Sequence, residues 1–298
     1  MRATRIVTLV SYCQSLAIRH FLSLGLPGFV GIIFSVRYTS VVIEFNRFEG
    51  WVRRHFATYV FLRRLAPIFC KFINLEEGFD FLRFVRLKSQ DLVVVDVGAN
   101  DGTSIRMIRR YLKNIKIIAI DPVQRPRFQM RQIEFHDVAL DEKEGEKVLY
   151  TPILKSKRLT QYSSFFRDKL SEAVQHDTSF AIDEVLIEER VVKTRTLDSL
   201  KIEPVFIKID VEGAEMSVLR SSKLTLENFH PILLIEVLSF EIYEEISVFL
   251  QQLGYFNLSP GFQRDEHGAF VKNIEFLPTV RNYLWLHSNS SLKWEILQ

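Results

Sequence analysis

The chain has 298 residues, of which 47% are hydrophobic and 25% are charged, and this balance excludes a disordered or fibrous protein. Its 39 basic and 36 acidic residues leave a net charge of +3, too close to neutral to indicate a nucleic-acid partner. The two cysteines, Cys13 and Cys70, are too far apart in sequence for a paired-cysteine metal knuckle. So few cysteines also exclude a disulfide framework and favour a reducing compartment.

The first ninety residues differ in charge from the rest of the chain. They contain 13 Lys and Arg against 5 Asp and Glu, whereas residues 91–298 contain 26 against 31. The longest uncharged run, from Phe21 to Val36, is shorter than the roughly 20 apolar residues of a spanning helix. One proline and three glycines also interrupt it. We therefore expect neither a transmembrane segment nor a cleaved signal peptide.

Residues 1–75 are expected to form a helical arm, and in their sequence arginines are interleaved with bulky apolar side chains. This pattern suits a cap packed on the next domain, with the arginines on its solvated side. It also suits peripheral contact with a membrane, with apolar side chains in the headgroup layer and arginines on phosphates. RNA is a third reading, but no recognisable nucleic-acid-binding motif supports it, and we expect no nucleic-acid partner. Residues 76–298 are expected to form the second domain, and the protein is expected to be cytoplasmic. If the arm contacts a membrane, we expect it to do so at the inner face.

From residue 92 onward, short β-branched runs alternate with helical patterns, as in a mostly parallel sheet with crossover helices on both faces. The sequence predicts an α/β fold with seven strands. The two latest strands suit an antiparallel edge hairpin. The predicted strands cover residues 92–97, 115–120, 133–140, 205–209, 232–237, 255–258 and 282–286, and the clearest helices cover 103–113 and 241–253.

Acidic residues stand at or near the carboxyl ends of five predicted strands. In an open α/β sheet, ligands bind outside this edge, where the strand order reverses. The five acids therefore predict a ligand site on one rim of the sheet. They are Asp96, Asp121, Asp137, Asp210 and Glu236.

The turn after the first strand reads Asp96-Val-Gly98-Ala99-Asn100-Asp101-Gly102. It lacks the G-x-G-x-x-G spacing that places a pyrophosphate on a helix terminus. Its acids would repel a pyrophosphate and attract a cation, which suits S-adenosylmethionine with its sulfonium and ammonium groups. Asp121, at the end of the second strand, is placed to accept hydrogen bonds from ribose hydroxyls. A purely structural glycine turn is the alternative.

The sequence resembles the FkbM-type methyltransferase family in several motifs, which occur in the order and rough spacing of that family. They are the turn 96–102, Asp121-Pro122, Thr196-Leu-Asp198, the block from Ile207 to Glu215 and Pro231-Ile-Leu-Leu-Ile-Glu236. The resemblance covers about residues 92–240 and implies a class I, Rossmann-like fold, S-adenosylmethionine as cofactor and O-methylation of sugar hydroxyls in polysaccharides, glycolipids or natural products. Asp121 stands where the family commonly has Glu, and residues 1–75 lie outside the resemblance. The residues expected to bind the cofactor are Asp96, Gly98, Ala99, Asn100, Gly102, Thr103, Asp121, Pro122, Asp137 and Val138.

The strand ending at Asp210 supplies the candidate catalytic residues. Strand geometry places Lys208 and Asp210 on the same side, so the ammonium can lie beside the carboxylate. Asp210 is the first candidate for orienting or deprotonating an acceptor hydroxyl, and Glu212 and Glu236 are alternatives. A structural ion-pair cluster is the competing reading. Such carboxylates could also hold Mg²⁺ or Ca²⁺, but we expect no metal.

A long insert separates the third and fourth predicted strands and contains Tyr162-Ser163-Ser164-Phe165-Phe166. Inserts of this kind often recognise the acceptor, because aromatic rings and hydroxyl groups can contact a sugar. The resemblance supports a role on the substrate side for Tyr162, Ser163 and Ser164, and a plain surface loop is the alternative. Two further function classes stay open, a catalytically silent Rossmann-like scaffold or membrane-binding module and, with less support, a nicotinamide-dependent oxidoreductase.

Overall fold

The computed structural model describes residues 78–84, 92–123, 125, 131–154, 156–168, 170, 185–258, 271–272, 274–278 and 280–290. The chain divides into two compact units, Met1–Ile73 and Asn74–Gln298, and every described residue belongs to the second unit. The basic arm over residues 1–75 lies outside the described residues, and its contacts stay a prediction. Within the described part, no helix is long and apolar enough to cross a membrane.

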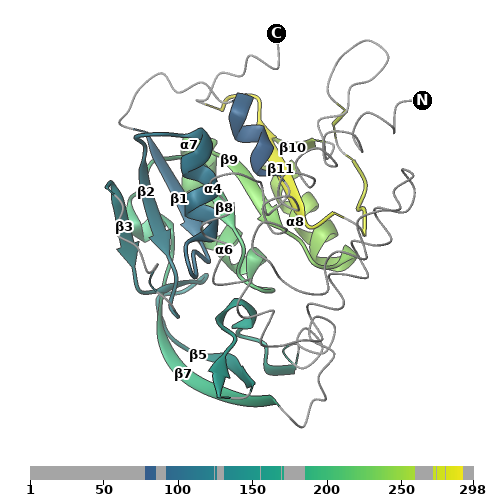
Figure 1. The fold of residues 1–298 in the computed structure, drawn as a ribbon. Helices are drawn as coiled ribbons and strands as arrows, with labels where there is room; N and C mark the ends of the chain where they lie inside the picture. The colour runs from purple at the N-terminus through teal and green to yellow at the C-terminus, as the bar shows by residue number, and fades with distance from the viewer. Residues whose placement is uncertain are drawn as a thin grey trace, which may run out of the picture. The chain divides into compact units, whose positions relative to one another are not determined.

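Seven strands form one sheet in the order β10-β11-β9-β8-β1-β2-β3 (Figure 1). The central strands β3, β2, β1, β8 and β9 pair in parallel, whereas β11 pairs antiparallel with both β9 and β10. The predicted mostly parallel sheet with an antiparallel edge is confirmed. The strands are β1 Val93–Val97, β2 Lys116–Ile120, β3 Ile133–His136, β8 Pro204–Ile209, β9 Ile232–Glu236, β10 Tyr255–Leu258 and β11 Asn282–His287.

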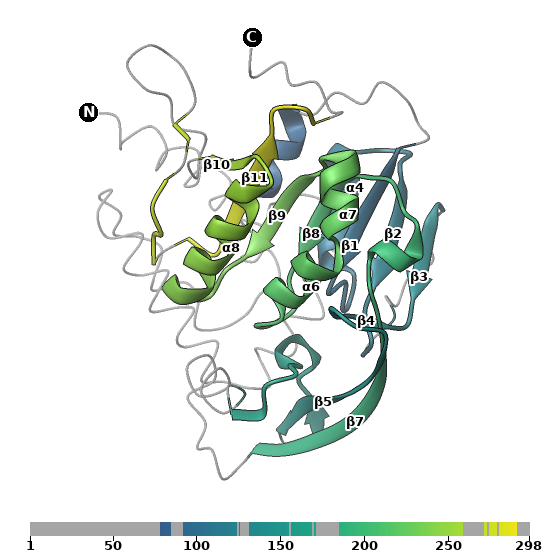
Figure 2. The same cartoon turned by 180° about the vertical axis from the view of Figure 1, so that it is seen from behind.

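Helices cover both faces of this sheet, as Figures 1 and 2 show from opposite sides. On one face α4, Thr103–Tyr111, packs with the 3-10 helix η1, Phe79–Phe84. The other face carries α6 Glu215–Ser221, α7 Lys223–Phe229 and α8 Phe240–Gln252. Ser239 is the N-cap residue of helix α8, and its hydroxyl accepts the backbone N–H of Ile242 and so satisfies one of the unpaired donors of the first turn.

The main core lies between the central strands and helices α6, α7 and α8. Strands β8 and β9 are apolar almost throughout because both faces of a doubly covered parallel sheet are buried. Strand residues of this core include Val95, Ile118, Ile207 and Leu233, and they pack with Val218, Leu219, Leu226, Tyr243, Ile246 and Leu250 of the helices.

The prediction of one strand over residues 133–140 was wrong. The chain leaves the main sheet after β3, and Ala139–Leu140 form a separate strand, β4, in a second sheet with the order β4-β7-β5-β6. The other strands are β5 Gly145–Leu154, β6 Lys157–Arg158 and β7 Val185–Arg195. Charged residues interrupt the apolar alternation of β7, so its sequence gives a weak strand signal. Antiparallel pairing along the full length of β5 stabilises β7 instead.

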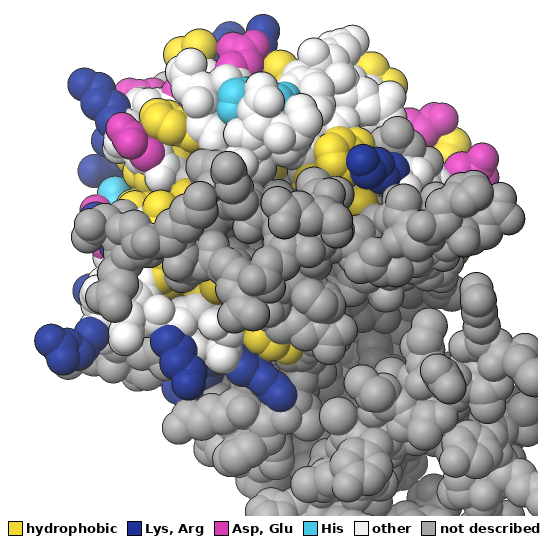
Figure 3. Space-filling view, turned by 90° about the horizontal axis from the view of Figure 1, so that it is seen from above, with side chains coloured by type: hydrophobic (Ala, Val, Ile, Leu, Met, Phe, Trp, Pro, Cys, Tyr) yellow, Lys and Arg dark blue, Asp and Glu magenta, His cyan; other side chains and the backbone are white. Residues whose placement is uncertain are grey.

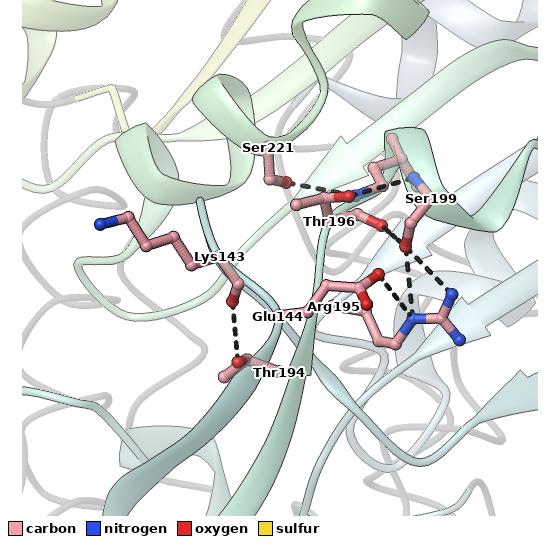
Figure 4. Close-up of polar contacts among 8 residues, drawn as sticks. Lys143, Glu144, Thr194, Arg195, Thr196, Ser199 and Ser221 are labelled. Atoms are coloured by element: carbon pink, nitrogen blue, oxygen red, sulfur yellow. Dashed lines mark hydrogen bonds and ion pairs between the residues drawn. The ribbon is translucent and has the colours of Figure 1, made fainter.

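Polar contacts secure the end of β7 where the chain returns to the main sheet (Figure 4). The Thr194 hydroxyl donates to the Lys143 carbonyl at 2.9 Å, and the Arg195 Nε donates to Glu144 Oε1 at 3.1 Å. Arg195 also donates to the Ser199 hydroxyl at 3.2 Å. These contacts join the end of β7 to the turn between β4 and β5 and to the segment that leads to β8.

Two histidines stack where α7 and β11 end. The rings of His230 and His287 lie 4.0 Å apart, centroid to centroid, with an interplanar angle of 19°. Burial lowers the pKa of His287, and the neighbouring His230 lowers it further. Seen from above, the described surface shows histidine side chains among interspersed acidic and basic groups, without a large field of one sign (Figure 3).

Candidate active site

The turn after β1 packs directly against the end of β8. Gly98 has φ of +83°, and a Cβ atom there would lie 1.7 Å from the carbonyl oxygen of Asp210. The Gly98 N–H donates to the Ile120 carbonyl at 2.9 Å, and the Asp210 N–H donates to the Val97 carbonyl at 3.1 Å. Glycine is required here because β1 and β8 exit side by side, and no side chain fits between them.

Asp121 joins the end of β2 to the same turn. Its Oδ2 accepts the N–H of Asn100 at 2.9 Å, and its Oδ1 accepts the N–H of Val123 at 2.7 Å. The side chain is almost fully buried. The structure thus places the predicted ribose-binding carboxylate against the predicted cofactor turn. Pro122 follows Asp121 in the chain, and the Ala99 N–H donates to the Ile120 carbonyl at 3.4 Å.

The start of α4 is unsuited to a pyrophosphate. The Asp101 carboxylate accepts both the N–H of Thr103 at 3.0 Å and its hydroxyl at 2.7 Å. A negative side chain therefore occupies the helix terminus where a dinucleotide would need free N–H groups. Gly102, with φ of +83°, allows the turn to enter the helix. A negative side chain at this position fits S-adenosylmethionine, which carries positive charge and no phosphate.

Two other predicted cofactor positions have contrasting surroundings. Asp96 is completely buried and accepts the hydroxyl of Ser104 in α4 at 2.6 Å, so it fixes that helix on β1. Asp137 is exposed and Val138 is half-buried, and both lie between β3 and β4 where the chain changes sheets. Their roles in cofactor binding stay predictions.

The carboxyl ends of β8 and β9 bring three acidic groups together. One carboxylate oxygen from each of Asp210, Glu212 and Glu236 lies within 4.8 Å of the other two. Lys208 Nζ lies 2.9 Å from Asp210 Oδ2, as expected from their placement on one side of β8. The lysine side chain is 1% exposed and the Asp210 side chain is 28% exposed, so Asp210 is the member of the pair that a ligand can reach.

The Glu236 side chain is 14% exposed, half the exposed fraction of Asp210. Burial, the charge of Asp210 and a hydrogen bond with Asp210, in that order of size, together raise the pKa of Glu236 to about 10. Lys208 opposes this shift. Since the raised value lies well above neutrality, Glu236 is protonated at pH 7 and can donate to Asp210. The carboxyl groups of Asp210, Glu212 and Glu236 can also offer oxygen ligands to a hard cation. The expectation of no metal at this site stays a prediction.

The turn after β8 is braced from within. Glu212 has φ of +52°, and the next residue, Gly213, also has positive φ. Glu215 Oε1 accepts the N–H groups of Gly213 at 3.0 Å and Val211 at 3.4 Å. Burial raises the pKa of the Glu215 carboxyl, although these two donors act against the shift. Glu215 therefore shapes the turn that carries Glu212.

The hydroxyl groups of the insert are engaged in the fold. Ser163 and Thr151 are joined by a 2.9 Å hydrogen bond, and Ser164 Oγ donates to the Glu212 carbonyl at 2.8 Å. Tyr162 is buried beside them in the 3-10 helix η2, Thr160–Tyr162. This part of the insert is fixed beside the site and is not a loose surface loop. Direct substrate contact by Tyr162, Ser163 and Ser164 stays a prediction.

The Thr196–Asp198 motif has a structural role. The Asp198 carboxylate accepts the N–H groups of Leu224 at 3.0 Å and Thr225 at 2.8 Å, and also the Thr225 hydroxyl. These contacts satisfy donors in the first turn of α7.

A hollow of about 670 Å³ lies at the opposite edge of the sheet. Its lining includes Leu92, Pro204, Val205 and His230, and none of the five rim acids lines it.

The comparisons with known proteins agree with this geometry. Residues 96–256, more than half of the chain, match the model of the methyltransferase FkbM domain. The chain belongs to the FkbM methyltransferase family. S-adenosylmethionine is accordingly its cofactor, and the oxidoreductase reading is set aside. A search of curated proteins gives no significant match for this methyltransferase.

Solved methyltransferases resemble the chain at low identity. A methyltransferase FkbM from Methylobacillus flagellatus is 14% identical with a TM-score of 0.39, and the match covers 71% of this chain and 48% of that one. This FkbM-family chain thus spans about half the length of that protein. An S-adenosylmethionine-dependent O-methyltransferase from Thermotoga maritima is 9% identical with a TM-score of 0.33, covering 69% of this chain and 62% of that one.

Sequence reasoning missed two contacts that shape the site of this methyltransferase. Ser104 binds the buried carboxylate of Asp96, and Thr160 Oγ1 donates to Asn100 Oδ1 at 2.9 Å. Helical spacing could have placed Ser104 on the sheet side of α4, next to the apolar Ile105 and Ile108. No local signal could have found Thr160, because it is 60 positions from Asn100 and lies in the second sheet's insert.

Proposed function

We propose that this methyltransferase transfers a methyl group to a hydroxyl oxygen of a sugar in a polysaccharide, a glycolipid or a related metabolite. The observation that carries the proposal is the pair of Lys208 and Asp210, in which the cation is buried and the carboxylate is partly exposed. A carboxylate at this edge can accept the hydrogen bond of a hydroxyl group and then its proton. Adjacent sugar hydroxyls also suit the neighbouring carboxyl groups of Glu212 and Glu236.

When bound, S-adenosylmethionine supplies an electrophilic methyl group attached to a positively charged sulfur. Asp121 and the turn from Gly98 to Gly102 would hold the cofactor at the ends of β1 and β2. Asp210 accepts the hydrogen bond of the acceptor hydroxyl and so directs an oxygen lone pair toward the methyl group. During transfer of the methyl group to that oxygen, the Asp210 carboxylate would take up the hydroxyl proton.

Lys208 and Glu236 prepare Asp210 for this role. The buried ammonium of Lys208 keeps Asp210 ionised before the reaction, since an opposite charge at 2.9 Å favours the charged form. Protonated Glu236 adds a neutral hydrogen-bond donor without adding a second negative charge. Asp210 is therefore an orienting group that becomes the proton acceptor late in the transfer.

The test uses the full chain, methyl-labelled S-adenosylmethionine and a panel of methyl glycosides, phenols and amines. We expect label on glycoside oxygen. Asp210→Asn should lower turnover about 10²- to 10⁴-fold and keep cofactor affinity in a calorimetric titration. Asp141→Asn is the matched control, because Asp141 forms a similar 3.0 Å pair with Lys147 away from the rim.

Each part of the proposal has its own contradicting result. Wild-type turnover in Asp210→Asn would remove Asp210 from the reaction. Label on amines alone would replace O-methylation by N-methylation.

A further inference from the structure

Each of the two ligand turns contains a non-glycine residue in the left-handed backbone region. In the cofactor turn, residues 98–102, this residue is Asn100 with φ of +42°. In the acid turn, residues 210–213, it is Glu212 with φ of +52°. Such conformations are uncommon outside glycine and persist where surrounding contacts hold them. The contacts that hold these two residues are therefore informative.

One short segment of the insert contacts both residues. Thr160 Oγ1 donates to Asn100 Oδ1 at 2.9 Å, and Ser164 Oγ donates to the Glu212 carbonyl at 2.8 Å. The two hydroxyl groups are only four positions apart in the chain. Segment 160–164 therefore bridges the end of β1 and the end of β8 from the outside.

The bridging segment is firmly seated. Ser164 and Tyr150 exchange two backbone hydrogen bonds of 3.0 Å, and Thr151 binds Ser163 through their hydroxyls. Tyr162 and Ser164 are 6% and 4% exposed. Because the segment is held on β5 and internally hydrogen-bonded, a shift at its Thr160 end is transmitted to its Ser164 end instead of being absorbed by a loose loop.

We propose that segment 160–164 couples the two turns, so that ligand binding at the cofactor turn orders the acid turn, with Thr160 and Ser164 as positioning residues. The proposal rests on the proposed function, because it takes residues 98–102 as the cofactor turn. Ligand that fixes Asn100 also fixes Thr160, and Ser164 then holds the Glu212 carbonyl and the cluster that contains Asp210. Acceptor binding would accordingly follow cofactor binding, through a coupling free energy between the two sites.

Hydrogen exchange of the acid turn tests this coupling without any acceptor. The N–H groups of Val211 and Gly213 both donate to Glu215 Oε1, so their exchange reports whether the turn is ordered. The full chain is measured with and without saturating S-adenosylhomocysteine, by mass spectrometry of a peptide spanning residues 208–216. We expect the ligand to slow exchange in the wild-type protein.

In Thr160→Val, the factor by which the ligand slows exchange should be roughly 2- to 12-fold smaller than in wild type, which corresponds to the free energy of one hydrogen bond. Thr160→Ser, which keeps the hydroxyl, should retain it. Thr194→Val is the matched control, since it removes a 2.9 Å hydroxyl bond to the Lys143 carbonyl, which lies outside segment 160–164 and outside both turns. Ser164→Ala should speed exchange with and without ligand.

The outcomes separate the coupling from the function. Equal slowing in wild type, Thr160→Val and Thr194→Val, with ligand binding intact, would overturn the coupling alone. A calorimetric titration that shows no binding of S-adenosylhomocysteine by the wild-type chain would overturn the proposed function and the coupling with it. A Thr160→Val protein that is unfolded by circular dichroism is replaced by Thr160→Ala, for which the same loss is expected.

Discussion

Replacing Glu236 by Gln tests the central electrostatic feature of the site. The Glu236 side chain is 14% exposed, and burial among Asp210 and Glu212 raises its pKa from 4.5 to about 10. Gln has nearly the shape of the protonated acid and cannot ionise. The variant should therefore fold normally and lose the pH dependence that Glu236 gives to the wild-type protein.

Proton linkage gives the sign and the size of the change in folding stability with pH. A raised pKa means that Glu236 contributes stability that is complete below pH 4.5 and is lost as pH rises toward 10. One proton taken up on folding gives a slope of at most about 1.4 kcal/mol per pH unit. From pH 6 to pH 9 the stability of Glu236→Gln relative to wild type should thus rise by up to about 4 kcal/mol.

Besides Lys208, Arg281 also lies near Glu236. Its guanidinium lies 4.0 Å from Glu236 Oε1 and would favour the ionised form. The arginine side chain is 53% exposed, so water and salt screen most of that attraction. Burial and the neighbouring carboxylates therefore outweigh it.

Urea unfolding of both proteins at pH 6, 7, 8 and 9 measures the difference directly. Glu241→Gln is the control that should show no pH dependence from pH 6 to 9, because hydrogen bonds at the start of α8 lower the pKa of Glu241. Its stabilising contribution is present at neutral pH and is lost as pH falls below 4.5. A difference between Glu236→Gln and wild type that stays constant from pH 6 to 9 would refute the reasoning, and it would mean that three ionised carboxylates share the site and need a cation.

Three further changes test the surroundings of the site. Asp121→Asn should weaken S-adenosylmethionine binding about tenfold in a calorimetric titration, since it removes a charge that accepts the N–H of Asn100 and faces the ligand turn; unchanged affinity would remove Asp121 from the cofactor site. Gly98→Ala should lower the unfolding midpoint sharply and reduce soluble yield, because its Cβ would lie 1.7 Å from the Asp210 carbonyl oxygen in a backbone that already has positive φ; a wild-type melting temperature would contradict the packing of β1 on β8. The lowered pKa of His287 means that stability is lost as pH falls below 6.5, so His230→Gln, which removes the repulsion between stacked rings, should reduce that loss in thermal melts between pH 7 and 5; identical acid sensitivity would show that the histidine pair is not involved.

The central strands could be predicted because burial on both faces leaves an almost continuous apolar run. Val93–Val97, Lys116–Ile120 and Ile232–Glu236 end close to the predicted residues. The second sheet could not be found in this way. Strand β7 carries Glu188, Glu189 and Arg190 in succession, so its pattern resembles a solvated segment, and its partner β5 lies more than thirty positions earlier in the chain.

The sequence by itself determined the rim of acids and the glycine turn. Strand ends share one edge of a parallel sheet, so Asp121, Asp210 and Glu236 could be placed along that edge once the strands were known. It also determined the family, through the turn after β1 and the block from Ile207 to Glu215. These features are local, or follow from the regular geometry of strands.

Only the tertiary structure decided which of these groups are buried, paired or joined. The exposure of Asp210 beside the buried Lys208, the protonation of Glu236 and the link from Thr160 to Asn100 depend on segments that are distant in sequence. Desolvation and charge interactions act through space over a few ångströms, and spacing along a chain does not encode those distances.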